Sequence, residues 1–216
     1  MEQAEKNRGR VGWELDQAGR QLQGGTERRD AARNRRVILE TARALFGERG
    51  VTGVTMEEIA RTAAVGKGTL YRRFPNKGLL CQALLDEPTR RLQGEVLADL
   101  GDASMTPLEK LGRFLERLVA FTEENLDLLY GGHETLAGAD RLAQLAHPSN
   151  EWRRGTVLGL LRLAQRSRKL EAELDAEYLA DALLAPLDVD LYYYQRKVRG
   201  TSSKRIADGL RSLVPG

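Results

Sequence analysis

The clearest pattern of hydrophobic and polar positions lies in residues 54–77, where it predicts two short helices joined by a tight turn. Thr55 can cap the first helix, and Glu58, three residues later, can return a hydrogen bond to the backbone N–H of the cap. Val54 before the cap and Ile59 after it can close a hydrophobic staple. We therefore expect the first helix to begin at Thr55.

The second helix of the pair combines a buried face with an unusual exposed one. It follows an interruption of small residues over 63–66, and Leu70 and Phe74 can share its buried face. Pro75 ends it, and Asn76 can cap the next helix. The exposed positions carry cations, hydroxyls, an aromatic ring and a glycine, which suits a helix that meets phosphates and base edges in a major groove. We expect contacts to DNA bases from Thr69, Tyr71 and Arg72. Contacts that position the DNA backbone are expected from Thr55, Lys67, Gly68 and Lys77.

Residues 54–77 resemble the DNA-binding helix-turn-helix of the TetR family of bacterial transcriptional regulators. The chain departs from the family pattern at Ala64, where Gly is usual, and at Gly66, where a helix-capping Ser is usual. The matching positions are Thr55, Ile59, Ala60, Val65, Lys67, Gly68, Thr69, Leu70, Tyr71, Phe74 and Lys77.

The resemblance implies an all-α protein with an amino-terminal three-helix DNA-binding domain, followed by a helical ligand-binding and dimerisation domain. It implies a homodimer formed through the last two helices and a pseudo-palindromic operator. It also implies a repressor, rather than an activator, that leaves the operator when an unknown small-molecule effector binds. The expected division is a disordered tail over 1–29, the DNA-binding domain over 30–77 and the regulatory domain over 78–216.

Apolar residues recur at helical spacing through most of the remaining chain. They predict a helix over 30–49, one from 76 that breaks at Pro88, and another over 89–100. Further helices are expected from Thr106 to a break at Gly131-Gly132, over 133–145, from Asn150 to about Arg168, from Asp175 with a kink at Pro186, and after a cap at Ser202.

The charge distribution supports a DNA-binding amino-terminal half. The net charge is +3, but residues 1–80 contain 16 Lys or Arg against 10 Asp or Glu, and the remainder contains 18 against 21. Positive charge therefore accompanies the proposed DNA reader. The single cysteine, Cys81, excludes an internal disulfide and two histidines offer no metal signature, so no cofactor or metal is expected. Because no apolar run of 18 residues occurs, we expect a cytoplasmic protein without membrane contact.

The carboxyl half has no recognisable ligand motif. Candidates for lining an effector cavity, each of which could equally be ordinary core or surface, are Phe121, Thr122, Trp152, Thr156, Tyr178 and Asp181. One alternative is a nonspecific DNA-coating protein, which would show no strong sequence preference at fixed salt. Another is a helical enzyme using Asp181, Glu134 or His133, although no catalytic triad order, phosphate loop or metal spacing supports it. We therefore expect no enzymatic activity.

Overall fold

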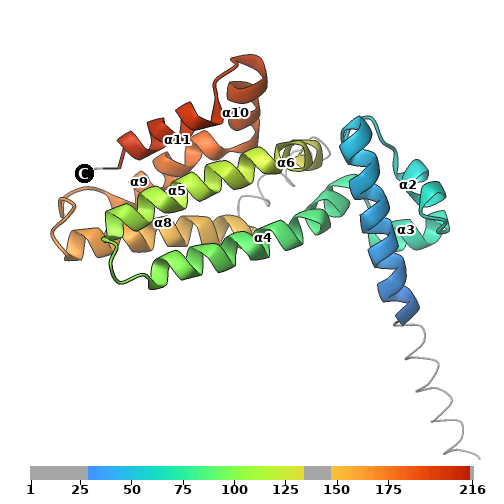
Figure 1. Cartoon of the computed structure of the whole chain (residues 1–216), viewed down its shortest axis with the longest axis horizontal. Helices are drawn as coiled ribbons and strands as arrows, with labels where there is room; N and C mark the ends of the chain where they lie inside the picture. Colours follow the sequence, from blue (N-terminus) through green and yellow to red (C-terminus); the bar gives the residue numbers. More distant parts are fainter. Residues whose placement is uncertain (1–28, 134–146, 215–216) are drawn as a thin grey trace, which may run out of the picture. The chain divides into compact units, whose positions relative to one another are not determined.

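The computed structural model describes residues 29–133 and 147–214, and over these residues it contains helices and connecting turns but no strand (Figure 1). The described residues fall into two units, one formed by residues up to Arg49 with Gly53–Pro75, and the other by Gly50–Thr52 with the chain from Asn76 onward. The elements are a helix over residues 29–49, α2 (Met56–Thr62), α3 (Lys67–Arg73), α4 (Lys77–Gly101), α5 (Pro107–Glu124), α6 (Leu126–His133), α8 (Pro148–Arg166), α9 (Ala176–Leu184), η1 (Ala185–Leu187), α10 (Val189–Tyr193), η2 (Tyr194–Val198) and α11 (Ser203–Ser212).

The first unit is a three-helix arrangement around a small apolar core. Ile38, Ala42 and Phe46 repeat every four residues on the helix over 29–49, and all three are buried. Ile59 from α2 and Leu70 from α3 are fully buried as well. A helix-turn-helix pair is thereby fixed on a third helix, with one face of each short helix inward and the other free.

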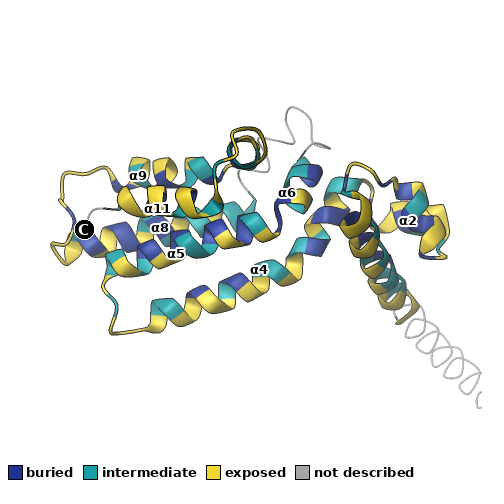
Figure 2. Ribbon diagram, turned by 45° about the horizontal axis from the view of Figure 1, so that its top comes forward, coloured by how far each residue is buried: buried dark blue, intermediate teal, exposed yellow. Residues whose placement is uncertain are grey.

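The second unit is built around α5, which packs against α4, α8 and α11 (Figures 1 and 2). Phe114, Leu115 and Leu118 of α5 are buried, and the core continues through Leu161 of α8 and Leu183 of α9. The start of α5 is the predicted one, because Thr106 and Glu109 form a reciprocal capping box.

The predicted break at Pro88 is wrong, because α4 runs without interruption from Lys77 to Gly101 with Pro88 inside it. A proline within a helix costs about 3 kcal/mol through its missing N–H and its ring clash. Here Leu84 before the proline and Leu92 after it lie on one four-residue row, and both are buried. Burial on both sides of Pro88 offsets the local cost, so tertiary packing decides the outcome.

The predicted break at Gly131-Gly132 is also wrong, because both glycines lie inside α6 and are buried. The helix instead ends at Asn125, where α5 gives way to α6. A Cβ on Gly131 would lie 2.5 Å from the Cβ of Val51, and one on Gly132 would lie 3.1 Å from the Cβ of Cys81. These glycines therefore serve close packing. Beyond His133, the helix expected over 133–145 lies outside the described residues. The same holds for residues 1–28 of the tail expected over 1–29, whereas residue 29 already belongs to the first helix.

The caps predicted at Asp175 and Ser202 are confirmed, since each side chain accepts a backbone N–H of its helix. At Pro186, where a kink is expected, the 3-10 turn η1 interrupts the α-helix and separates α9 from α10. After it, Tyr192 is fully buried and donates a hydrogen bond to the Glu123 carboxylate at 2.9 Å. Arg196 pairs with the same carboxylate, so one partly buried cluster anchors this segment to α5.

Candidate functional site

The start of α2 has the predicted capping box. The Thr55 hydroxyl accepts the Glu58 N–H at 3.2 Å, and the Glu58 carboxylate accepts the Thr55 N–H at 2.9 Å. The same carboxylate pairs with the Arg49 guanidinium at 3.1 Å, which ties α2 to the preceding helix. Val54 and Ile59, the expected staple, are both fully buried. Local sequence and packing thus fix the first helix of the pair together.

We expect the stability of the first unit to depend on pH through Glu58. The Thr55 N–H, and then Arg49, lower the pKa of Glu58 from 4.5 to about 2. Because the folded-state pKa is depressed, this group stabilises the fold above pH 4.5, and the contribution is lost as pH falls through 2. The melting temperature of Glu58→Gln should therefore lie below that of the wild type at pH 6, and the gap should close on acidification. Glu48→Gln, which removes an exposed carboxylate from the same unit, is the control. A gap between wild type and Glu58→Gln that did not change with pH would contradict this assignment.

The turn between α2 and α3 carries both departures from the family pattern. Ala64 has φ +51°, in the left-handed region that favours glycine. Gly66 occupies the N-cap of α3 and provides no side-chain hydrogen bond there. Position 64 therefore has a backbone conformation suited to glycine but carries alanine. The Cβ of Ala64 strains the backbone locally in this conformation.

Ala64→Gly is expected to stabilise the first unit by about 1 kcal/mol, since the left-handed conformation costs an alanine about 1–2 kcal/mol and glycine's greater freedom when unfolded returns part of this. Urea denaturation followed by circular dichroism would measure the change. Gly50, which has φ +73°, offers the reverse control, because Gly50→Ala should destabilise. A destabilising Ala64→Gly would show that the Cβ of Ala64 makes a contact worth more than the strain.

Tyr71 projects from α3 and is the aromatic centre of the candidate DNA surface. It is 39% exposed, and its hydroxyl donates to the Glu57 carboxylate of α2 at 2.9 Å. This hydrogen bond raises the pKa of Tyr71 and lowers the pKa of Glu57. The hydrogen bond to Glu57 of α2 thereby holds the Tyr71 ring in one orientation on the exposed face of the helix pair.

The other predicted contact residues of α3 surround Tyr71 in sequence and share its exposure. Lys67, Gly68 and Arg72 are exposed, and Thr69 is half-buried. A Cβ on Gly68 would meet nothing within 4 Å, so no contact inside the protein requires glycine there. An external surface approaching the backbone would explain this residue. The buried face, with Leu70 and Phe74, is the predicted one.

Lys77 opens α4 in the second unit, where Asn76 caps the helix by accepting the Leu79 N–H at 2.8 Å. The Lys77 ammonium donates to the carbonyl of Val51 at 2.8 Å and is partly buried. An ammonium has three donors, so this bond leaves two for other acceptors. The side chain is therefore positioned by the protein before any phosphate contact.

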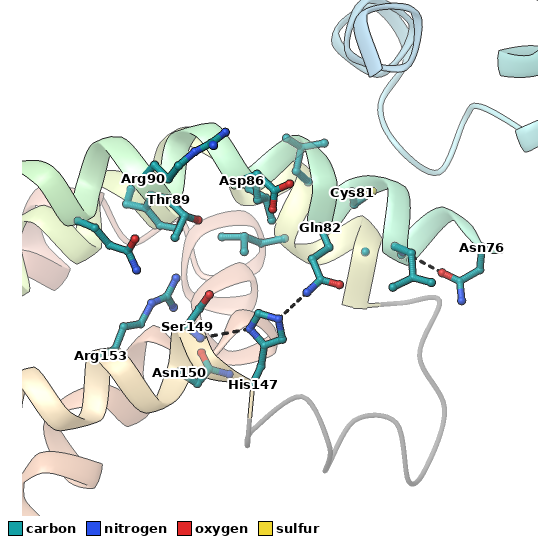
Figure 3. A pocket seen from close by; sticks show the side chains of 18 residues that line it. Asn76, Cys81, Gln82, Asp86, Thr89, Arg90, His147, Ser149, Asn150 and Arg153 are labelled. Carbon is teal, nitrogen blue, oxygen red and sulfur yellow. Dashed lines mark hydrogen bonds between the residues drawn. The ribbon is translucent and has the colours of Figure 1, made fainter. Parts of the chain in front are cut away.

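Two neighbouring cavities are lined by described residues of the second unit. The first, of about 700 Å³, is bounded by α4, α6 and the start of α8 (Figure 3). The second, of about 510 Å³, is bounded by α5, α6, α8 and the segment from α9 to α10. Both volumes fall in the range of small-molecule sites. Leu129, Asn150 and Arg153 line both cavities, so the two share a wall.

Three of the six predicted cavity residues line these spaces, namely Phe121 in the first and Thr122 and Asp181 in the second. Trp152 instead packs edge-on against Phe114, with ring centroids 5.6 Å apart. The Thr156 hydroxyl donates to the Trp152 carbonyl at 2.8 Å. Neither Trp152 nor Thr156 borders either cavity.

The expectation for Tyr178 is wrong, because its side chain is 74% exposed. The cap at Asp175 sets the start of α9, and Ala176, Ala180 and Leu183 then turn inward at spacings of four and three. Tyr178 is two residues from each of Ala176 and Ala180, which places it on the opposite side of the helix. This periodicity could have been read from the sequence.

Sequence reasoning missed Arg153 and the position of His133. Arg153 lines both cavities, although an arginine within an amphipathic helix ordinarily predicts a solvated face. His133 lines the second cavity, and its Nε2 is buried without a hydrogen-bond partner in the described chain, 3.8 Å from the Asp190 carboxylate. Neither residue stands in a motif, so only the packing of α6 against α10 and of α8 against α5 and α9 reveals these roles.

Residues 29–133 and 147–214 contain neither a metal-binding cluster nor a membrane-spanning helix. No group of three or more histidine, cysteine or acidic side chains is arranged to hold a metal ion. No helix there has both the length and the apolar character needed to cross a bilayer. Cys81 is buried, and burial raises the pKa of its thiol to about 12, as expected for a packing residue.

Comparison with known sequences supports the helix-turn-helix interpretation. Residues 38–84 match the model of the bacterial regulatory proteins of the TetR family. The chain is 25% identical over 190 residues to the HTH-type transcriptional regulator SAR0097 of Staphylococcus aureus strain MRSA252, covering 87% of this chain and 95% of that protein. It is 48% identical over 54 residues to the regulator SAUSA300_2515 of S. aureus strain USA300, covering 25% of this chain and 29% of the relative.

Comparison with solved structures extends the likeness in fold to both units. FadR from Bacillus subtilis, in complex with stearoyl-CoA, has a TM-score of 0.63 at 18% identity, covering 83% of this chain and 97% of its own. AibR, in complex with isovaleryl coenzyme A and operator DNA, has a TM-score of 0.56 at 24% identity, covering 84% and 98%. Together with the likeness in fold, the match over residues 38–84 and the relative aligned over nearly its full length support a regulator of the TetR family of bacterial transcriptional regulators.

Proposed function

We propose that this protein is a homodimeric repressor that binds a pseudo-palindromic operator through α3 and leaves it when a small molecule enters the second unit. The observation that carries the DNA-binding part is the outward face of α3. Lys67 and Arg72 are exposed there on either side of Tyr71, and neither forms an ion pair within the described residues. Such cations are available for phosphates and base edges.

Dimerisation is supported by apolar side chains that the second unit leaves uncovered near its carboxyl end. Leu191, Tyr194 and Val198 lie three and four residues apart on one side of the segment from α10 to η2, and they are 43%, 44% and 64% exposed. Contiguous exposed apolar residues of this kind favour a protein interface. A second copy is the occupant we propose, because a two-fold symmetric operator requires two α3 helices at fixed separation.

Response to a small molecule is supported by the two cavities and by the structural neighbours. Stearoyl-CoA is bound in the FadR structure, and isovaleryl coenzyme A with operator DNA in the AibR structure. An effector that binds one conformation of the second unit more tightly than the other would shift the population away from the DNA-binding state. We place the protein in the cytoplasm, where operator DNA is accessible.

Neither alternative function is favoured by the structure. For an enzyme, Asp181 would have to act as a free carboxylate, but it is paired with Arg154 at 2.7 Å. Glu134 lies outside the described residues. A nonspecific DNA-coating protein would use the same basic surface, so it is distinguished by sequence preference alone.

The proposal is tested by titrating the purified protein against the DNA upstream of its own gene, with nonspecific competitor, at two salt concentrations. A protected pseudo-palindrome with half-sites about 10 base pairs or a multiple apart supports the proposal, and so does a dimer mass by light scattering. Equal affinity for all duplexes at fixed salt, both here and in a selection from random sequence, would indicate the coating protein instead. A monomeric mass on the operator would contradict the dimer.

A further inference from the structure

Arg153 of α8 is the unusual charged residue of the second unit. It lines both cavities, and Figure 3 shows its side chain pointing from α8 into the space between α8 and α4. Its guanidinium lies over the ring of Phe121, 5.3 Å from the centroid. The cation therefore stands at the wall that the two cavities share, with an aromatic face on one side.

The other arginines of α8 that face α9 are paired with carboxylates. Arg154 contacts Asp181 at 2.7 Å, and Arg162 contacts Glu177 at 2.8 Å. Within the described chain, Arg153 has no carboxylate at ion-pair distance. Burial lowers the pKa of its guanidinium, which reflects how little water or countercharge surrounds it. Arg153 is partly buried, and a cation shielded from water without a paired carboxylate destabilises a fold, so its position beside two cavities favours a compensating anion.

The acidic side chains around these cavities do not supply that anion. Asp181 is held by Arg154, and the Asp188 carboxylate accepts the backbone N–H groups of Asp190 and Leu191 to cap α10. Asp86 of α4 and Glu151 of α8 also border the cavities but are outside ion-pair distance of Arg153 in the described structure. Among the described residues that line both cavities, Arg153 is thus the cation without a carboxylate at ion-pair distance.

The second cavity adds an apolar wall next to this cation. Aliphatic side chains from α5, α6, η1 and the residues beside η1 form part of its lining; they are Leu118, Leu129, Leu184, Leu187 and Val189. A space of about 510 Å³ accommodates a chain of several methylene groups. An apolar body and a negatively charged head would therefore satisfy both parts of the site.

We infer that the effector is an amphiphilic anion whose carboxylate or phosphate contacts Arg153 and whose aliphatic body fills the cavity bounded by Leu118, Leu129 and Leu187. This inference rests on the proposed function, since it names the chemical class of the effector that the regulator would sense.

Isothermal titration of the purified full-length protein, without DNA, tests the inference with three probes of equal chain length: octanoate, octyl phosphate and neutral octanol. The wild type should bind at least one of the two anions about 10- to 100-fold more tightly than octanol, as a charge-assisted contact implies. The tighter of the two anions identifies the head group. Lengthening the tighter anion should raise affinity by up to about fourfold per methylene until the cavity is full.

Arg153→Gln should lower the affinity for the preferred anion by the same 10- to 100-fold and leave octanol binding unchanged. Arg162→Gln, which removes an equal charge from the same helix away from the cavities, should change neither. The melting temperature of Arg153→Gln should stay within a few degrees of Arg162→Gln, whereas a large fall would identify Arg153 as structural and overturn the inference.

Three binding results would each overturn the inference. Octanol could bind as tightly as the tighter of the two anions, Arg153→Gln could retain the wild-type affinity for that anion, or neither anion could bind at millimolar concentration. Failure of the repressor proposal is separate. If an anion binds through Arg153 but the operator complex persists, the inference stands and the proposal that the effector releases the protein from its operator fails. If operator release occurs with a neutral compound only, the repressor proposal stands and the inference fails.

Discussion

Tyr71→Ala is expected to remove most of the preference for the operator over unrelated duplex, lowering specific affinity by about 10- to 100-fold. A good side-chain contact to a base edge contributes about 1–3 kcal/mol of discrimination, and Tyr71 is the exposed aromatic of α3. The change also frees the Glu57 carboxylate from its hydrogen bond, which places an unpaired negative charge beside the candidate DNA surface. Binding titrations with operator and scrambled duplexes at one salt concentration would measure the ratio.

Three companion variants separate the causes. Tyr71→Phe keeps the ring and removes the hydroxyl, and Glu57→Gln removes the negative charge while keeping Tyr71. Lys67→Ala should weaken all duplexes alike and reduce the salt slope by about one unit, because a phosphate contact carries no sequence information. If Lys67→Ala changed base preference while Tyr71→Ala did not, the assignment of base and phosphate contacts would be reversed. Because Tyr71 is exposed, we expect Tyr71→Ala to remain folded, and circular dichroism would check this.

Gly131→Ala is expected to destabilise the second unit by about 2 kcal/mol. The added Cβ would lie 2.5 Å from both the Cβ and Cγ1 of Val51, so either α6 or residues 50–52 must move. Overpacking of this kind costs about 1–3 kcal/mol. Urea denaturation followed by circular dichroism would give the difference in the free energy of unfolding.

Gly155→Ala in α8 is the matched control, because its added Cβ meets nothing within 4 Å. Alanine is the better helix former by about 1 kcal/mol, so this variant should be stabilised. Opposite signs for the two substitutions would confirm that contact with Val51, and not helix propensity, sets the effect at Gly131. Equal stabilisation of both would show that residues 50–52 relax without cost.

Val51 packs within the second unit and precedes the helix-turn-helix in sequence. Residues 50–52 follow the helix over 29–49 in sequence but belong to the second unit. Val51 contacts Gly131 through its side chain and Lys77 through its carbonyl. A ligand that shifts α6, which supplies Leu129 to both cavities, would therefore act on residues directly connected to the first unit. A change in operator affinity in the Gly131→Ala variant would support this route.

Local chemistry in the sequence determined the helix-turn-helix and most helix starts. The helix caps act through hydrogen bonds that span two or three residues, so the neighbouring residues suffice to predict them. These caps are Thr55 with Glu58, Thr106 with Glu109, Asp175 and Ser202. The outward placement of Tyr71 likewise follows from the burial of Leu70 and Phe74 on the same short helix.

Tertiary structure alone decided the features that depend on residues far apart in the chain. Pro88 and Gly131 ordinarily predict a break, yet both lie within helices, because burial against other elements outweighs a local cost of about 1–3 kcal/mol. The cavity site follows the same reasoning. Arg153 resembles any surface arginine in the sequence. Only the packing of α8 against α5 brings it over the Phe121 ring and beside the cavities, without a carboxylate of the described residues at ion-pair distance, and no local pattern encodes such distances between helices.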